Sequence, residues 1–141
     1  MPEQKYWLVK SEPGDYSFQD LQAEEDQTAE WDGVRNYQAR NNLRAMQVGD
    51  LVLYYHSNEG LAVVGVARIT KGAYQDPTTA DERWSVVDIE PVETLAVPIT
   101  LSEMKQDKKL QDMALIKQSR LSVMPVMKKE FDLIIKKGRA K

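Results

Sequence analysis

The stretch LVLYYHSNEGLAVVGVARI, residues 51–69, carries the strongest structural signal in this chain. Two runs rich in β-branched and aromatic residues, 51–56 and 61–69, flank the segment Ser57-Asn58-Glu59-Gly60. That segment has the composition of a turn, because its residues tolerate the backbone conformations that reverse the chain. The pattern therefore predicts a β-hairpin in the middle of the sequence.

Similar runs on either side of the hairpin predict further strands at 6–10, 84–90 and 119–126. The first of these stops at the segment 11–14, SEPG, a cluster of residues that interrupt regular structure. Pro91 and Pro98 are expected to bracket an extended passage after the second. The chain thus has more β structure than the hairpin alone.

Helices are predicted from capping residues and from apolar residues at helical spacing. Ser17 with Asp20, and Thr100 with Glu103, have the spacing of capping boxes, which open helices at about 18–24 and 101–109. The other helices are expected at about 34–46, at 112–117 and at 128–137, the last closed by Gly138. Strands and helices do not alternate regularly, which favours an α+β fold: a curled, mostly antiparallel sheet or small barrel with peripheral short helices.

Composition limits the chemistry that this chain can perform. Its 141 residues fit one domain over 1–141. The chain has no cysteine and one histidine, His56, which excludes disulfides, thiolate metal clusters and thiol nucleophiles. It also lacks the glycine-rich motifs that bind nucleotides and dinucleotides. We expect no catalytic residues, no metal and no cofactor.

Charge and hydropathy narrow the possible partners. The formal net charge is −3, so the chain cannot coat nucleic acid with a uniformly basic surface, and any such binding must be local. There is no apolar run approaching the roughly 20 residues that span a bilayer, and the first residues do not resemble a secretory signal. We therefore expect a protein of the cytoplasm or the nucleoid that does not bind membranes.

Aromatic and multidentate polar side chains are concentrated in the first 57 residues. A pocket for a nucleic-acid base needs these types, since flat rings stack on the base while amides and hydroxyls read its edge. Tryptophan and tyrosine are also common in protein cores, and residue type alone leaves that alternative open. Arg40 and Arg44 fall on one face of the predicted helix, where a solvated surface is the ordinary expectation.

Four blocks give the chain a family resemblance: YWLVKSEP at 6–13, WDGVRNYQARNNLR at 31–44, GDLVLYYHS at 49–57 and QSRLSV at 118–123. Together they resemble the EVE domain, and the resemblance covers about 5–137. It implies a PUA-like fold, a bent mixed β pseudo-barrel surrounded by short helices. It also implies a non-catalytic module that recognises a modified base, most of all a modified cytosine such as 5-methylcytosine in DNA, flipped into an aromatic and polar cleft.

The resemblance also implies which residues form the base pocket and its rim. They are Trp7, Lys10, Ser11, Trp31, Arg35, Asn36, Tyr37, Asn41, Tyr54, His56, Ser57, Arg120 and Ser122. From their side-chain types, Trp31 or Tyr37 would stack on the base. Asn36 and Ser11 would read its edge, while Lys10, Arg35 and Arg120 would meet phosphate.

Two other functions stay open at this point. PUA-like relatives of the ASCH kind include hydrolases, and Lys10, Glu12 and Tyr37 could serve such a reaction on RNA or a small amide. An aromatic cleft could also hold a free nucleoside or another flat small ligand. The choice between DNA and RNA, the modified base, the oligomeric state and any protein partner are likewise left open.

Overall fold

The computed structural model describes residues 5–12, 14, 16–24, 27–31, 36–57, 60–118 and 120–139. Its strands are β1 Tyr6–Ser11, β2 Ala29–Glu30, β3 Leu51–His56, β4 Ala62–Gln75, β5 Ser85–Thr100 and β6 Val123–Val126. Its α-helices are α1 Phe18–Gln22, α2 Tyr37–Ala45, α3 Leu101–Gln106, α4 Ala114–Lys117 and α5 Lys128–Arg139, and a 3₁₀ turn (η1) covers Lys108–Leu110. None of these helices is long and apolar enough to cross a membrane.

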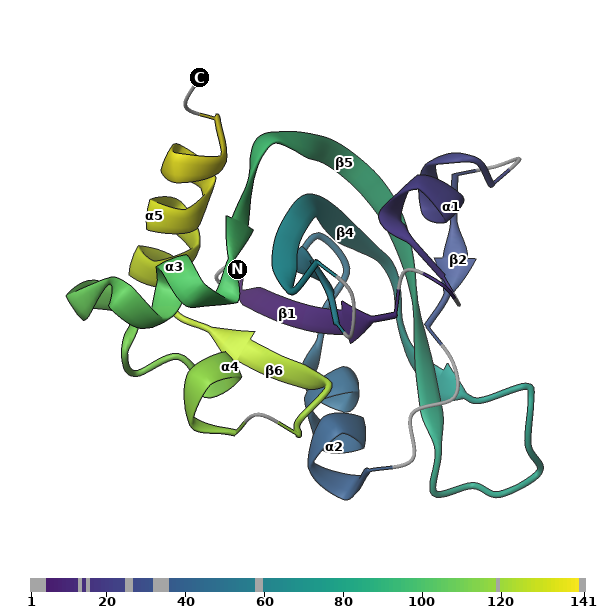
Figure 1. Ribbon diagram of the computed structural model, residues 1–141. Coiled ribbons are helices and arrows are strands. Elements are labelled where there is room, and N and C mark those ends of the chain that lie inside the picture. The colour runs from purple at the N-terminus through teal and green to yellow at the C-terminus, as the bar shows by residue number, and fades with distance from the viewer. Residues whose placement is uncertain are drawn as a thin grey trace.

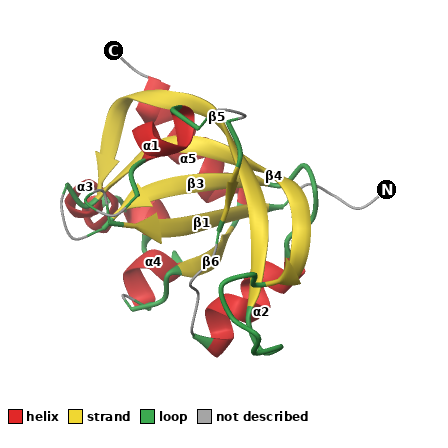
Figure 2. Ribbon diagram, turned by 90° about the vertical axis from the view of Figure 1, so that its right-hand side faces the viewer, coloured by secondary structure: helices red, strands yellow, loops and turns green. Residues whose placement is uncertain are grey.

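The strands form one mixed sheet in the order β2-β5-β4-β3-β1-β6. Among the described residues, β1 and β3 pair in parallel, and the other neighbouring strands pair antiparallel. Figures 1 and 2 show the sheet curling, with β5 arching over β4 and the short helices arranged around its periphery. The expected α+β, PUA-like architecture is confirmed, and within the described residues the sheet stays open, with β2 and β6 at its edges.

The curvature originates in the two long strands. Four register shifts interrupt the pairing of β4 with β5, and such irregularities bend a strand and increase its twist. Gly65 lies at one of them, and a Cβ atom at this position would come within 2.5 Å of the Phe18 ring. The absence of a side chain at Gly65 therefore lets α1 lie directly against the sheet.

The predicted hairpin is confirmed as β3 and β4, and Ser17 and Asp20 form the expected capping box. The extended passage belongs to a longer strand than expected, because both Pro91 and Pro98 lie inside β5, and Pro91 sits at a register shift that tolerates its missing N–H. Gly138 was expected to end the last helix, and this prediction is wrong. The helix continues through Gly138, where a Cβ atom would come within 2.7 Å of Leu95.

A buried carboxylate ties the start of β1 to the start of β3. Asp50 is 3% exposed and accepts three hydrogen bonds from N–H groups. The donors are the Trp7 indole Nε1 at 2.9 Å, the Lys5 amide at 3.1 Å and the Gln47 amide at 3.0 Å. Because three donors surround it, the carboxylate is held in the interior with no cationic partner among the described residues.

Candidate functional site

The parallel pairing of β1 with β3 brings two of the quoted sequence blocks to one edge of the sheet. The carboxyl ends of parallel strands lie together, so Ser11 is placed beside His56 and Lys10 beside Tyr55. Side chains alternate between the two faces of a strand, which puts Ser11 and His56 on one face and Lys10 on the other. The predicted polar residues of β1 are thus divided between the two faces of the sheet.

An aromatic cluster covers the face that carries Ser11. The Tyr54 ring is fully buried and meets Phe18, Trp31 and His56 edge-on at centroid distances of 5.2, 5.5 and 5.9 Å. Trp31 follows β2, and its backbone N–H donates to the Val87 carbonyl at 2.7 Å. The half-buried Trp31 indole is therefore held by β5 on its backbone side and by Tyr54 on its ring.

Two hydroxyl groups converge on the Tyr16 carbonyl beneath this cluster. Ser11 Oγ donates to it at 2.5 Å and Tyr54 Oη at 3.1 Å. Burial raises the pKa of Tyr54 to about 12, so its hydroxyl stays a donor at neutral pH. Ser11 and Tyr54 thus hold the segment that leads into α1, and an interaction between Ser11 and a base would have to compete with this bond.

His56 anchors α1 from the same face. The backbone N–H of Phe18 donates to His56 Nε2 at 3.0 Å, so this ring nitrogen must be an unprotonated acceptor. Burial lowers the pKa of His56, which favours the neutral ring that this bond requires. The role that the structure gives His56 is to hold α1 over the sheet.

This arrangement makes part of the stability depend on pH. The folded-state pKa of His56 lies below the ordinary value of 6.5, so the stabilisation is fully present above pH 6.5 and is lost as pH falls through the folded-state pKa. We expect the free energy of unfolding in urea to fall between pH 7.5 and 5.5. In His56→Gln, whose amide can accept the same bond without titrating, that fall should be smaller; an equal fall in both proteins would contradict this role.

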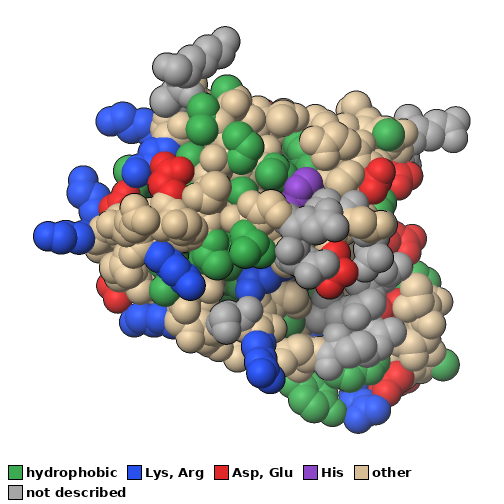
Figure 3. Space-filling view, viewed as in Figure 1, with side chains coloured by type: hydrophobic (Ala, Val, Ile, Leu, Met, Phe, Trp, Pro, Cys, Tyr) green, Lys and Arg blue, Asp and Glu red, His purple; other side chains and the backbone are tan. Residues whose placement is uncertain are grey.

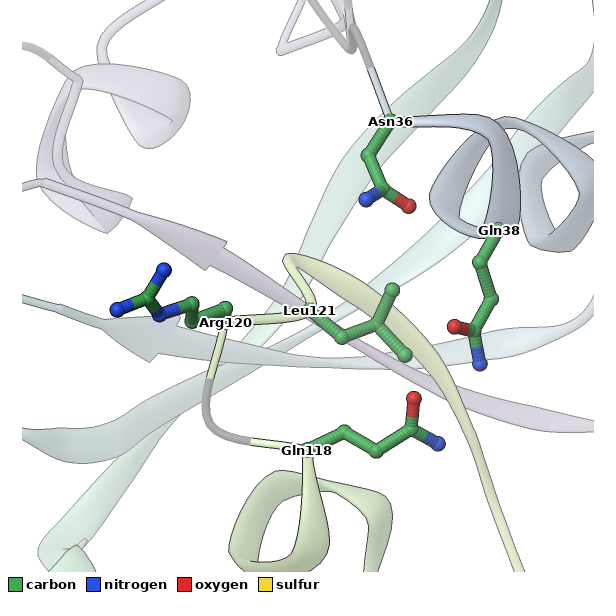
Figure 4. Close-up of a pocket in the computed structure, with 5 residues that line it drawn as sticks. All are labelled: Asn36, Gln38, Gln118, Arg120 and Leu121. Atoms are coloured by element: carbon green, nitrogen blue, oxygen red, sulfur yellow. The ribbon is translucent and has the colours of Figure 1, made fainter.

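A surface hollow of about 350 Å³ lies between the start of α2 and the segment before β6, lined by Asn36, Gln38, Gln118, Arg120 and Leu121. Figure 4 shows Asn36 and Gln38 extending from α2 toward that segment, while Arg120 projects away from Leu121. The lining is rich in amide groups, which can donate and accept, as reading the edge of a base requires.

Asn36 has a double position at this hollow. Its side-chain Oδ1 accepts the Ala39 N–H at 2.9 Å and so caps α2. Its Nδ2 has no acceptor among the residues that the structure describes, and it remains a donor at the rim of the hollow. One amide can therefore cap the start of α2 and also present a hydrogen-bond donor to a ligand.

The hollow and the aromatic cluster lie on either side of the carboxyl end of β1. The sheet order places β1 between β3 and β6, and the Lys10 N–H donates to the Ser122 carbonyl at 2.9 Å. Asn42 Nδ2 donates to the Val123 carbonyl at 2.7 Å, which fixes α2 to β6. On the sheet face opposite to Ser11 and His56, Lys10 Nζ lies 5.9 Å from the Tyr55 ring centroid, and burial lowers the pKa of this lysine.

Three predicted residues have other partners in the structure. Trp7 is 4% exposed, and its indole bond to Asp50 makes it a core residue. Tyr37 is 52% exposed but stacks on Trp84, with ring centroids 5.3 Å apart. Asn41 accepts two hydrogen bonds from Arg40 on the exposed side of α2.

The other predicted residues divide as follows. Ser11, Trp31, Tyr54 and His56 meet in the aromatic cluster, and Ser57 adjoins it through the bond from its N–H to the Ser11 carbonyl. Asn36 and Arg120 line the hollow, and Ser122 borders it. Arg35 lies outside the described residues. Gln38 and Gln118 were missed, although both lie inside the quoted blocks, and their amide side chains were the signal available.

Charge is dispersed over the face of the molecule that is drawn in Figure 3. Figure 3 shows Lys and Arg side chains scattered over it, with Asp and Glu between them. Within the described ranges no group of three or more His, Cys, Asp or Glu side chains is placed to hold a metal ion. The site therefore offers hydrogen bonds and aromatic surface more than concentrated charge.

Comparison with known proteins identifies the family. The sequence model of the EVE domain matches residues 5–137. Mouse thymocyte nuclear protein 1 is 41% identical over 162 residues, an alignment that covers 92% of this chain and 72% of the mouse protein. An ASCH structure from Zymomonas mobilis, at 10% identity and a TM-score of 0.59, shares the fold alone.

Solved structures agree with that assignment. The crystal structure of a protein from Agrobacterium tumefaciens is 44% identical, with a TM-score of 0.92 and coverage of 95% of this chain and 92% of that one. The human THYN1 protein, crystallised in complex with 5-methylcytosine-containing DNA, is 34% identical, with a TM-score of 0.90 and coverage of 98% and 99%. On its sequence and its fold, this chain belongs to the EVE domain family.

Proposed function

We propose that this chain is a non-catalytic module that binds nucleic acid carrying a modified base, with a modified cytosine in DNA as the favoured target. The observation that carries the proposal is the likeness to the human THYN1 protein, whose structure contains 5-methylcytosine DNA. That likeness extends over 98% of the chain, and the family match over residues 5–137 includes every block that contributes to the aromatic cluster and the hollow.

The region around the carboxyl end of β1 suits a base that has left its stack. The hollow volume of about 350 Å³ lies within the range of small-ligand sites. Its amides can bond to the edge of the base, and in the neighbouring cluster the Trp31 indole keeps part of its surface exposed, as His56 also does. The proposal includes a specific binding mode, in which a flipped base is enclosed between the hollow and the aromatic cluster.

Binding fits these residues better than hydrolysis does. Of the side chains that an ASCH-like reaction would use, Lys10 lies against Tyr55, whereas Tyr37 stacks on Trp84. General acid–base catalysis needs its groups within hydrogen-bond reach of one substrate atom, and these neighbours do not bring the two together. RNA as the partner, and a location in the cytoplasm or on the nucleoid, stay predictions.

The test is a titration with matched oligonucleotides, single- and double-stranded, carrying cytosine, 5-methylcytosine, 5-hydroxymethylcytosine, adenine or N6-methyladenine. We expect one modified strand to bind at least about tenfold tighter than its plain match, about 1.4 kcal/mol. Asn36→Ser replaces the capping amide oxygen with a hydroxyl oxygen that can also cap α2, but it removes the amide donor, so the preference should shrink while thermal stability is retained.

The oligonucleotide series also separates the alternatives. Equal affinity for every strand, or none for any, would contradict base recognition by this chain. Tighter binding of free modified nucleosides than of oligonucleotides would favour a small-ligand protein. Loss of preference in Asn36→Ser together with a lowered melting temperature would point to the cap of α2 as the cause.

A further inference from the structure

A stack of aromatic and guanidinium groups joins α2 to the loop 76–84 before β5. Tyr37 lies on Trp84 with an interplanar angle of 23°, and the Arg40 guanidinium carbon lies 5.0 Å from the Tyr37 ring centroid. Arg83 continues the arrangement, with its guanidinium carbon 5.8 Å from the Trp84 ring and its Nη1 donating to Tyr37 Oη at 3.0 Å. We call Tyr37, Arg40, Arg83 and Trp84, together with Arg44, the arginine–aromatic surface.

The arginines of α2 are fixed in place by the loop. Arg44 donates from Nη2 to the Glu82 and Arg83 carbonyls at 3.2 and 3.3 Å and from Nε to Ser85 Oγ at 3.0 Å. Arg40 donates from Nη1 to the Arg83 carbonyl at 3.3 Å. These bonds leave Arg44 Nη1 without an acceptor in the described part of the chain.

The charge around these arginines is favourable to an anion. The sequence of α2, YQARNNLRA, contains two arginines and no acidic residue. Within the described ranges neither Arg40 nor Arg44 pairs with a carboxylate, whereas Arg83 pairs with Asp81 at 2.5 Å. Glu82 is a further acidic neighbour in the loop. The two helix arginines are therefore the members of the surface whose charge is not neutralised by a partner.

We propose that the arginine–aromatic surface binds backbone phosphates of the same strand that presents its base to the hollow. This inference rests on the proposed function for its partner, a nucleic acid. Guanidinium N–H groups bind phosphate oxygens, and here their positions are set before a ligand arrives, with the Arg44 Nη1 donors left for phosphate. Backbone carbonyls and ring faces hold them, so little side-chain entropy is lost on binding.

The position along α2 supports the same strand as the occupant. Asn36 lines the hollow and Tyr37, the next residue, begins the arginine–aromatic surface. At the lower edge of Figure 3, where Figure 1 places α2 and the loop before β5, hydrophobic and Lys or Arg side chains lie next to one another. A strand whose base enters the hollow can therefore continue along this surface.

The experiment measures how affinity depends on salt. Each phosphate contact contributes about 0.9 to the slope of log K against log salt on duplex DNA and about 0.7 on single strands. We expect Arg40→Gln and Arg44→Gln each to lower the slope by about that amount. Affinity for plain and modified strands should fall by the same factor, because phosphate contacts carry no sequence information. Arg68→Gln removes a guanidinium on β4 that pairs with Glu90 on β5, and it should change neither quantity.

A purely structural role of these arginines predicts other results. Arg44→Lys keeps the charge but loses the fork of bonds to the loop, so the wild-type slope should survive even if stability in urea falls. An unchanged slope in both glutamine variants, with preference for the modified strand intact, would overturn the surface and leave the base pocket standing. A lowered slope without any base preference would overturn the base pocket and leave the arginine–aromatic surface standing. Absence of all nucleic-acid binding would overturn both the pocket and the surface.

Discussion

Replacing Trp31 by alanine is expected to weaken binding of the preferred modified strand by about tenfold to a hundredfold. Stacking of a base on an aromatic side chain contributes roughly 1–3 kcal/mol, and each 1.4 kcal/mol is a factor of ten. The Trp31 ring meets Tyr54 at 84° and its backbone N–H is bonded to the Val87 carbonyl. Because the ring is positioned before binding, its removal costs the full stacking energy. The measurement is the same oligonucleotide titration.

Two further variants identify the cause of that loss. Trp31→Phe keeps a flat ring and should retain most of the affinity, whereas Trp31→Leu keeps apolar bulk and should behave like alanine. Denaturation in urea shows whether each variant is still folded. Wild-type affinity in a folded Trp31→Ala protein would exclude this residue as the stacking partner.

The second large effect concerns stability and not binding. Asp50→Ala should lower the free energy of unfolding by about 3 kcal/mol or more, since hydrogen bonds to a charged group contribute about 1.5–3 kcal/mol each. Three N–H donors, from Trp7, Lys5 and Gln47, lose their shared acceptor in this variant. Urea denaturation at pH 7 gives the difference directly.

A matched aspartate provides the control for Asp50. Asp112 is exposed and pairs with Lys117 at 3.3 Å, and Asp112→Ala should change stability by no more than about 0.5 kcal/mol. In Asp50→Asn one oxygen remains but an NH₂ group faces N–H donors, so an intermediate loss is expected. Equal stability of Asp50→Ala and wild type would show that water can replace the carboxylate.

Much of the fold could be predicted from local pattern. The hairpin of β3 and β4 follows from two runs of β-forming residues around a turn, and the helix starts at Ser17 and Thr100 follow from side-chain caps. Gly138 defeated the same reasoning, because the contact that requires a glycine there comes from Leu95, far away in sequence. The full length of β5 was hidden for a related reason, since its pairing with β4 accommodates the prolines. The single-domain organisation over 1–141 stays a prediction.

The candidate site was predictable in its residue types and less so in its geometry. Trp31, Asn36 and His56 lie at the cluster or the hollow, and their roles in binding stay predictions. The Trp7 indole donates a hydrogen bond to Asp50, and Tyr37 stacks on Trp84, which lies 47 positions further along the chain. Neither partner shares a local motif with the residue it binds. Side-chain type therefore identified the candidates, while only the packed structure could show which of them were already engaged.

The position of β1 between β3 and β6 in the sheet has a consequence for folding during synthesis on the ribosome. β1 emerges first, yet its two neighbours in the sheet are β3, about forty residues later, and β6, more than a hundred residues later. Contacts so distant in sequence slow folding, and a nascent chain holds β1 with one unpaired edge until β6 arrives. The hollow is lined by residues on both sides of that last gap, Asn36 and Arg120. Affinity for a ligand should thus appear only in the final kinetic phase of folding, together with the pairing of β6 with β1.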